Sequence, residues 1–215
     1  ETIATLINYQ THPVVLGPEN LAISADYPGY MMNKVEAELG GQAMFLQGAA
    51  GDINPFWDKT PPEEGGFAEA EKMGLAVAAE AARTAKAIDE YADDPDIKVH
   101  TELITLAERR DRAREARDIQ AEVNSVLIGD DIALATFPGE FFVEHGLSLK
   151  ERSRFPHTFF IGYTNDALAY FPTIQATTEG GYGAESATRV EVGAGEYLVN
   201  RALINLYYLA EMITP

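Results

Sequence analysis

His12 is the first residue of this sequence whose type and position suit metal chemistry. It follows the apolar run 2–9 and stands directly before Pro13, which biases the backbone of His12 toward extended conformations. A neutral imidazole held in this way is a good zinc ligand. Taken alone, the residue leaves open a second interpretation, in which His12 only forms a hydrogen bond in a loop.

Glu140 and Tyr170 also stand at the ends of apolar segments. Glu140 lies among phenylalanines, and a carboxylate in such surroundings needs a partner, of which a metal ion is one kind. Its alternative role is a favourable negative charge at the start of a helix predicted over 140–152. For Tyr170 the alternative is a packed ring with a hydrogen-bonded hydroxyl group.

The segment 48–55, GAAGDINP, contains two further polar candidates, Asp52 and Asn54. Its glycines permit tight turns and a close approach of the backbone to a ligand. It is not a phosphate-binding loop, because it lacks the GK[ST] pattern and belongs to a strongly acidic chain. Asp52 and Asn54 could therefore also be a turn pair and nothing more.

Composition excludes several classes of function. The net charge of −18, from 34 acidic and 16 basic residues, disfavours binding to nucleic acids. The chain has 0 cysteines, which excludes disulfides and thiolate metal sites and leaves His, Asp, Glu and Tyr as ligands. No apolar run approaches the length of about 20 residues that a membrane span needs. The GxSxG and HExxH motifs are absent, and His100, His145 and His157 are expected to be structural.

Strand-like and helix-like segments alternate along the chain, which predicts an α/β fold with a mixed β-sheet flanked by helices. In such folds the active-site loops lie at strand ends. A charged helix or linker is expected over 107–118, and a long irregular loop is expected to reach residue 193. Strands are predicted at 2–9, 42–48, 96–106, 122–129, 131–138 and 157–164, and helices at 24–40, 67–91, 140–152 and 195–212.

Several of these segments, taken in order, resemble the catalytic domain of the neutral/alkaline (non-lysosomal) ceramidases. They read NYQTHPVVLG, SADYPGY, MFLQGAAGDINP, FPGEFF, FIGYTNDALAYFPT and EGGY, and they span residues 8 to about 190. The resemblance implies a zinc-dependent amidohydrolase that cleaves the amide bond of ceramide or a related N-acyl lipid. It implies that His12, Glu140 and Tyr170 match three zinc ligands. It also implies that the position of Asn54 belongs to the active site, and that the protein is secreted, periplasmic or on the cell surface. Asn54, Asp52 and Tyr170 are the candidate catalytic residues, and Asp52 or Asp26 could orient a ligand imidazole.

Three departures from the family pattern bear on this interpretation. The family serine of a GDVSP-like loop is replaced by Asn54, and the tyrosine before EGG is replaced by Thr178. A THTHSGP-like segment with a further histidine ligand does not occur. Residues 1–215 are therefore expected to form a partial catalytic domain, with the upstream part and an immunoglobulin-like domain absent. A zinc hydrolase of the same fold with a different, non-lipid ester or amide substrate, or a non-catalytic binding domain with a degraded site, remain as alternatives.

Overall fold

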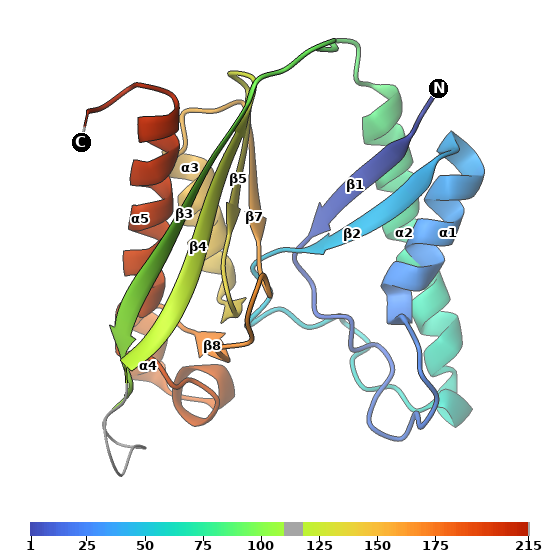
Figure 1. Cartoon of the computed structure of the whole chain (residues 1–215). Coiled ribbons are helices and arrows are strands. Elements are labelled where there is room, and N and C mark those ends of the chain that lie inside the picture. Colours follow the sequence, from blue (N-terminus) through green and yellow to red (C-terminus); the bar gives the residue numbers. More distant parts are fainter. Residues whose placement is uncertain (110–117, 215) are drawn as a thin grey trace. The chain divides into compact units, whose positions relative to one another are not determined.

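The computed structural model in Figure 1 describes residues 1–109 and 118–214. The chain forms two compact units. Unit 1 contains Glu1–Leu46 and Asn54–Tyr91, and unit 2 contains Gln47–Ile53 and Ala92–Pro215. Most of the charged segment predicted over 107–118 lies outside the described residues.

Unit 1 is a small α/β layer. β1 (Ala4–Tyr9) and β2 (Gln42–Gln47) form a two-stranded sheet, and α1 (Asp26–Leu39) connects them. A short 3₁₀ turn (Pro62–Glu64) leads into α2 (Gly66–Lys86), which packs against α1. The helices and the sheet share a core of Ile7, Met31, Val35 and Ala78.

The predictions for unit 1 are confirmed apart from the length of its second helix. That helix ends at Lys86 rather than at residue 91. Arg83 and Lys86 lie in its last turn, where positive charge complements the helix dipole, whereas the acidic residues Asp89 and Glu90 just beyond would oppose it. Charge therefore favours the earlier end of α2.

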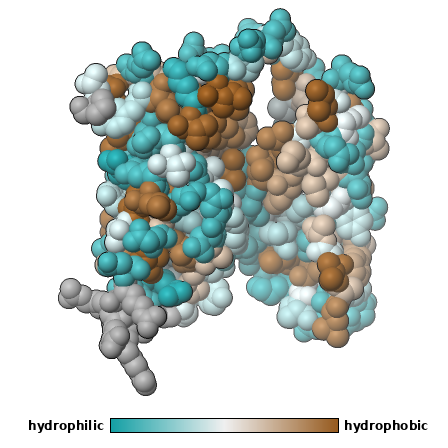
Figure 2. Space-filling model, in the orientation of Figure 1, coloured by the Kyte–Doolittle hydropathy of each residue, from teal (hydrophilic) through white to brown (hydrophobic). Residues whose placement is uncertain are grey.

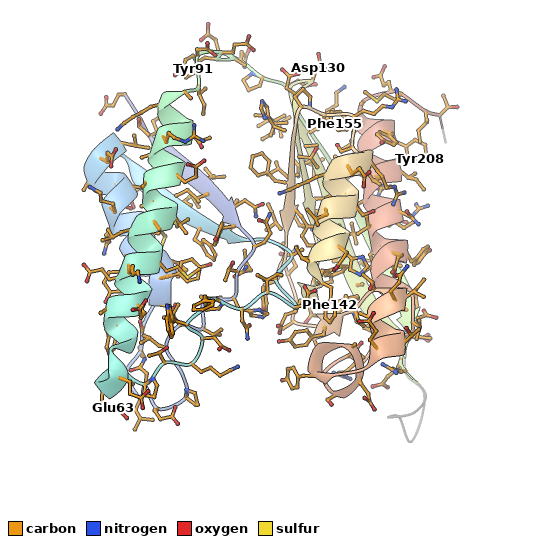
Figure 3. The ribbon with its side chains drawn as sticks, turned by 180° about the vertical axis from the view of Figure 1, so that it is seen from behind. Glu63, Tyr91, Asp130, Phe142, Phe155 and Tyr208 are labelled. Atoms are coloured by element: carbon orange, nitrogen blue, oxygen red, sulfur yellow. The ribbon has the colours of Figure 1, made fainter. Side chains whose placement is uncertain are left out.

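A four-stranded sheet forms the centre of unit 2, in the order β3-β4-β5-β7. The first two strand pairs are antiparallel and the pair β5–β7 is parallel, which confirms the predicted mixed sheet. The helices α3 and α5 pack against each other and against this sheet (Figures 1 and 3). The elements are β3 (Ile97–Ala107), β4 (Asp118–Ile128), β5 (Ile132–Thr136), β7 (His157–Ile161), α3 (Val143–Arg152) and α5 (Ala194–Leu209).

Two predictions for unit 2 were wrong. Glu140 does not begin a helix: it lies in the short strand β6 (Glu140–Phe141), and α3 begins only at Val143. The segment expected to be an irregular loop up to residue 193 contains β8 (Tyr170–Phe171), α4 (Ile174–Glu179) and a π-helical turn (Tyr182–Ser186). In both cases a two-residue strand was too short to produce a recognisable period in the sequence.

The surface mixes polar and apolar residues. On the face shown in Figure 2, hydrophilic residues cover much of each unit and apolar residues lie between them in separate groups. Among the described residues, no helix combines the length and the apolar character needed to cross a membrane.

Candidate active site

The parallel pair β6–β8 places Glu140 directly opposite Tyr170, and Phe141 opposite Phe171. Successive side chains of a strand point to opposite sides. Phe141 and Phe171 are fully buried and stack with ring centroids 4.2 Å apart, whereas Glu140 and Tyr170 are only partly buried. Each strand thus has one apolar residue that packs in the core and one polar residue that does not. The two phenylalanines hold the strand pair in the core, and the side chains of Glu140 and Tyr170 lie together beside the core.

Tyr163 joins this pair from the loop that follows β7. The hydroxyl groups of Tyr163 and Tyr170 both donate hydrogen bonds to the carboxylate of Glu140. This places one carboxylate between two phenols, and all three side chains belong to unit 2. We refer to these three residues below as the Glu140 cluster.

Both phenols of the Glu140 cluster hold their protons more tightly than an ordinary tyrosine. Burial raises the pKa of Tyr163 and of Tyr170, and the hydrogen bond to the negative charge of Glu140 raises each pKa further. At neutral pH, with no metal bound, both hydroxyl groups are therefore hydrogen-bond donors.

The glycine-rich segment 48–52 holds β6 in place. The backbone N–H of Gly51 donates to the carbonyl oxygen of Phe141 at 2.7 Å, and the N–H of Val143 donates to the carboxylate of Asp52 at 2.7 Å. A Cβ atom on Gly51 would lie 2.6 Å from the carbonyl oxygen of Glu140. The close backbone approach expected of these glycines is thus made to a strand of the chain itself.

Asp52 binds the first turn of α3, where backbone N–H groups have no partner within the helix. Desolvation raises the pKa of Asp52, the hydrogen bond from Val143 opposes this rise, and the neighbouring charge of Glu144 adds to it. The structure therefore gives Asp52 a positioning contact next to β6, while its predicted catalytic role stays a prediction.

His12 and Asn54 belong to unit 1. His12 is buried, with 8% of its surface exposed, just beyond β1. The side chain of Asn54 is exposed and donates to the carboxylate of Asp58 at 3.0 Å. Next to His12, Pro13 forms part of a surface pocket of about 410 Å³ that is also lined by Asp26, Met32 and Phe45.

The donors within the Glu140 cluster fit part of a metal site. Zinc accepts carboxylate oxygen and imidazole nitrogen, and a phenol oxygen can add to them. In the described parts of the chain, no three His, Asp or Glu side chains gather into a group that could hold a metal ion. The Glu140 cluster is thus an oxygen-rich partial set that would need nitrogen ligands from elsewhere.

Sequence reasoning missed Tyr163. Tyr182 contacts Tyr170 from outside the Glu140 cluster. The ring of Tyr182, on the π-helical turn, packs edge-on against Tyr170 with centroids 5.5 Å apart, and 72% of Tyr182 is exposed. Thr178 donates its hydroxyl to the carbonyl oxygen of Gln175 within α4. The signal for Tyr163 was its place two residues beyond the end of β7, in the segment IGYTN.

The mixed sheet flanked by helices, with a carboxylate–phenol cluster where two short strands pair, defines the class of the chain as an α/β protein. The chain has the fold of a portion of a neutral ceramidase. It matches the crystal structure of neutral ceramidase from Pseudomonas aeruginosa with a TM-score of 0.78 at 16% identity, over 100% of this chain. It matches a ceramidase complexed with C2 with a TM-score of 0.76 at 17% identity, over 98% of this chain. The resemblance predicted from the sequence segments is confirmed at the level of the fold.

The chain spans less than half of these solved structures, 45% of the first and 46% of the second. No protein-family model matches the sequence, and no curated protein matches it. The likeness is thus one of three-dimensional structure, reached at low sequence identity.

Proposed function

We propose that this chain is part of a zinc-dependent amidohydrolase that cleaves the amide bond of ceramide or of a related N-acyl lipid. The observation that carries the proposal is the pairing of Glu140 with Tyr170 in strand register, in a chain with the fold of the neutral ceramidases. These are two of the three residues that the sequence resemblance names as ligands.

Glu140 and Tyr170 would hold the metal through oxygen. His12 is proposed as a nitrogen ligand on the strength of its THP motif. A bound zinc ion would lower the pKa of a water molecule to about 7 and polarise a carbonyl group. The chain itself holds the carboxylate of Glu140 in one orientation. It does so through the two phenols that donate hydrogen bonds to the carboxylate and through the hydrogen bond from Gly51 to β6.

A different substrate is the second candidate, and Asn54 favours it. Asn54 replaces a serine of the resemblance pattern, and its amide donates to Asp58. Thr178, which replaces a tyrosine, donates its hydroxyl within its own helix. A zinc hydrolase that acts on a non-lipid ester or amide would accommodate both changes.

The test is hydrolysis of a fluorescent short-chain ceramide by the protein in its full natural length, with and without a chelator. We expect release of the fluorescent product that stops with chelator and returns with Zn²⁺. Hydrolysis of a water-soluble N-acyl amide or ester without any hydrolysis of ceramide would favour the second candidate. Absence of chelator-sensitive hydrolysis of every substrate, together with no bound zinc, would reject both and leave a binding domain.

A further inference from the structure

The backbone of Tyr163 adopts a conformation that a tyrosine rarely adopts. Its φ angle is +54°, in the left-handed region, where a bulky side chain is strained. A glycine would adopt this conformation freely, and Gly162 directly precedes it. Local conformational preference therefore does not explain a tyrosine at this position.

Backbone hydrogen bonds enforce the turn at Tyr163. Three successive N–H groups are bound: that of Gly162 by the carbonyl oxygen of Gln47 at 2.8 Å, that of Tyr163 by Gly139 at 3.3 Å and that of Thr164 by Phe137 at 3.0 Å. Two of these acceptors come from the segment that leads into β6. The turn is thus built against the strand that carries Glu140.

The consequence of the turn is the direction of the phenol. Tyr163 is 42% exposed, but its hydroxyl group donates a hydrogen bond to the carboxylate of Glu140. Strained residues held by several surrounding bonds are found at functional sites, where the strain serves to place a side chain. Tyr170 is not itself in the left-handed region, and it reaches the same carboxylate through strand register.

The two phenols therefore have different roles available to them. A carboxylate offers about four lone-pair directions, so Glu140 can accept a hydrogen bond and still bind a cation. If Tyr170 is a ligand, as the proposed function has it, Tyr163 is the phenol that remains to hold the carboxylate. Hydrogen-bond partners of metal ligands orient those ligands and tune their affinity.

We propose that Tyr163 is a positioning residue that orients the carboxylate of Glu140 for metal binding through its hydroxyl group. This inference rests on the proposed function, because it requires a metal at Glu140. It goes beyond that function by assigning a role to a residue that is not among the proposed ligands.

The variant Tyr163→Phe tests the proposal, since it removes the hydroxyl group and keeps the ring. Tyr182→Phe is the matched control: it makes the same change in a neighbouring exposed phenol that packs on Tyr170. In the full-length protein, we measure zinc affinity by competition with a chromophoric chelator, the visible spectrum of the Co²⁺-loaded protein, and Tm of the metal-free protein. We expect Tyr163→Phe to weaken zinc binding by about tenfold or more and to change the Co²⁺ spectrum, with Tm unchanged, and Tyr182→Phe to leave all three unchanged.

A second variant separates the hydroxyl group from backbone strain. Tyr163→Asn keeps a residue that tolerates the left-handed region but removes the phenol, so it should lose zinc affinity as Tyr163→Phe does. The role of Tyr163 would be overturned if Tyr163→Phe or Tyr163→Asn kept the wild-type zinc affinity and Co²⁺ spectrum while Glu140→Gln lost zinc. The proposed function would still stand in that case. A lower zinc affinity accompanied by a lower Tm of the metal-free protein would also overturn the role of Tyr163, because the hydroxyl group would then stabilise the fold. If the wild-type protein binds no zinc through Glu140, the proposed function itself fails.

Discussion

The carboxylate of Asp52 accepts a hydrogen bond of 2.7 Å from the backbone N–H of Val143, a residue 91 positions further along the chain. Asp52 thus accepts a hydrogen bond from a backbone N–H in the first turn of α3. An N-cap side chain usually does this at the start of its own helix, whereas Asp52 does it from a distant segment of the chain. Because Val143 follows β6 closely, the same bond helps to fix the strand that carries Glu140.

We predict that Asp52→Ala lowers the free energy of unfolding by about 1 kcal/mol, the usual cost of a lost helix cap. Asp52→Asn should cost clearly less, because the amide oxygen can still accept the hydrogen bond from Val143. Denaturant unfolding of both variants at neutral pH measures the difference. Equal losses in the two variants would show that the charge, rather than the acceptor, supplies the stabilisation.

The position of Gly51 leaves no space for a side chain. A Cβ atom there would lie 2.6 Å from the carbonyl oxygen of Glu140 and 3.0 Å from that of Phe141, and backbone atoms cannot rotate away as a flexible side chain can. We expect Gly51→Ala to destabilise the protein by about 3 kcal/mol, the upper range for overpacking. It should also weaken zinc binding, because β6 has to shift. Wild-type Tm and zinc affinity in Gly51→Ala would contradict the inference that segment 48–52 holds β6 in place.

The charge of Glu140 should be visible in the titration of the tyrosines. Burial and the hydrogen bond to Glu140 raise the pKa of Tyr163 and Tyr170, so Glu140→Gln should lower both values while leaving the contribution of burial. Nuclear magnetic resonance of the labelled tyrosine ring carbons in the metal-free protein, followed during an alkaline titration, measures this shift for each tyrosine separately. Tyr27, whose pKa is raised mainly by burial in unit 1, is the internal control that should not move.

The same raised pKa values make a prediction about alkaline stability. Above the ordinary tyrosine pKa of about 10, the unfolded chain releases phenol protons that the folded chain retains, so stability falls as pH rises through this range. Glu140→Gln should flatten this fall. An identical alkaline slope in wild type and variant would show that the charge of Glu140 does not act on the two phenols.

Most of the larger elements could be predicted from the sequence because their patterns are long. β4 alternates buried and less buried residues over Asp118–Ile128, and the turn at Gly129, with a φ of +59°, follows from glycine's freedom. The strands predicted at 122–129 and 131–138 are both present and pair antiparallel, with Ile128 opposite Ile132.

The site was only partly predictable because it depends on short pairings between distant segments. Glu140 and Tyr170 were named as candidates, but their two-residue strands have no period, and their partnership exists only once β6 and β8 lie side by side. Tyr163 was missed for a related reason. Its turn is enforced by hydrogen bonds from residues far away in the sequence, against the preference of the residue itself.

His145 was expected to be structural, and it lies in α3 with only 3% of its surface exposed. One ring nitrogen donates to the carbonyl oxygen of Pro172, whereas Nε2 has no hydrogen-bond partner within the part of the chain that the structure describes. A Cβ atom on Gly195 would lie 2.3 Å from Nε2, so α5 packs directly on the ring. A proton on Nε2 would therefore be buried against helix backbone.

This burial lowers the pKa of His145, although Glu196, the carbonyl of Pro172, Glu144 and Asp52 oppose the shift. Because the folded state disfavours the proton and the unfolded state takes it up near pH 6.5, the protein should lose stability as pH falls through and below about 6.5. His145→Gln should remove this component of the slope. His157→Gln is the control, since His157 is exposed at the start of β7. Urea unfolding at a series of pH values from neutral to mildly acidic measures it. If His145→Gln retained the wild-type slope, another buried group would be taking up the proton, whereas a flat slope in His145→Gln alone would assign the acid sensitivity of unit 2 to the packing of α5 on this ring.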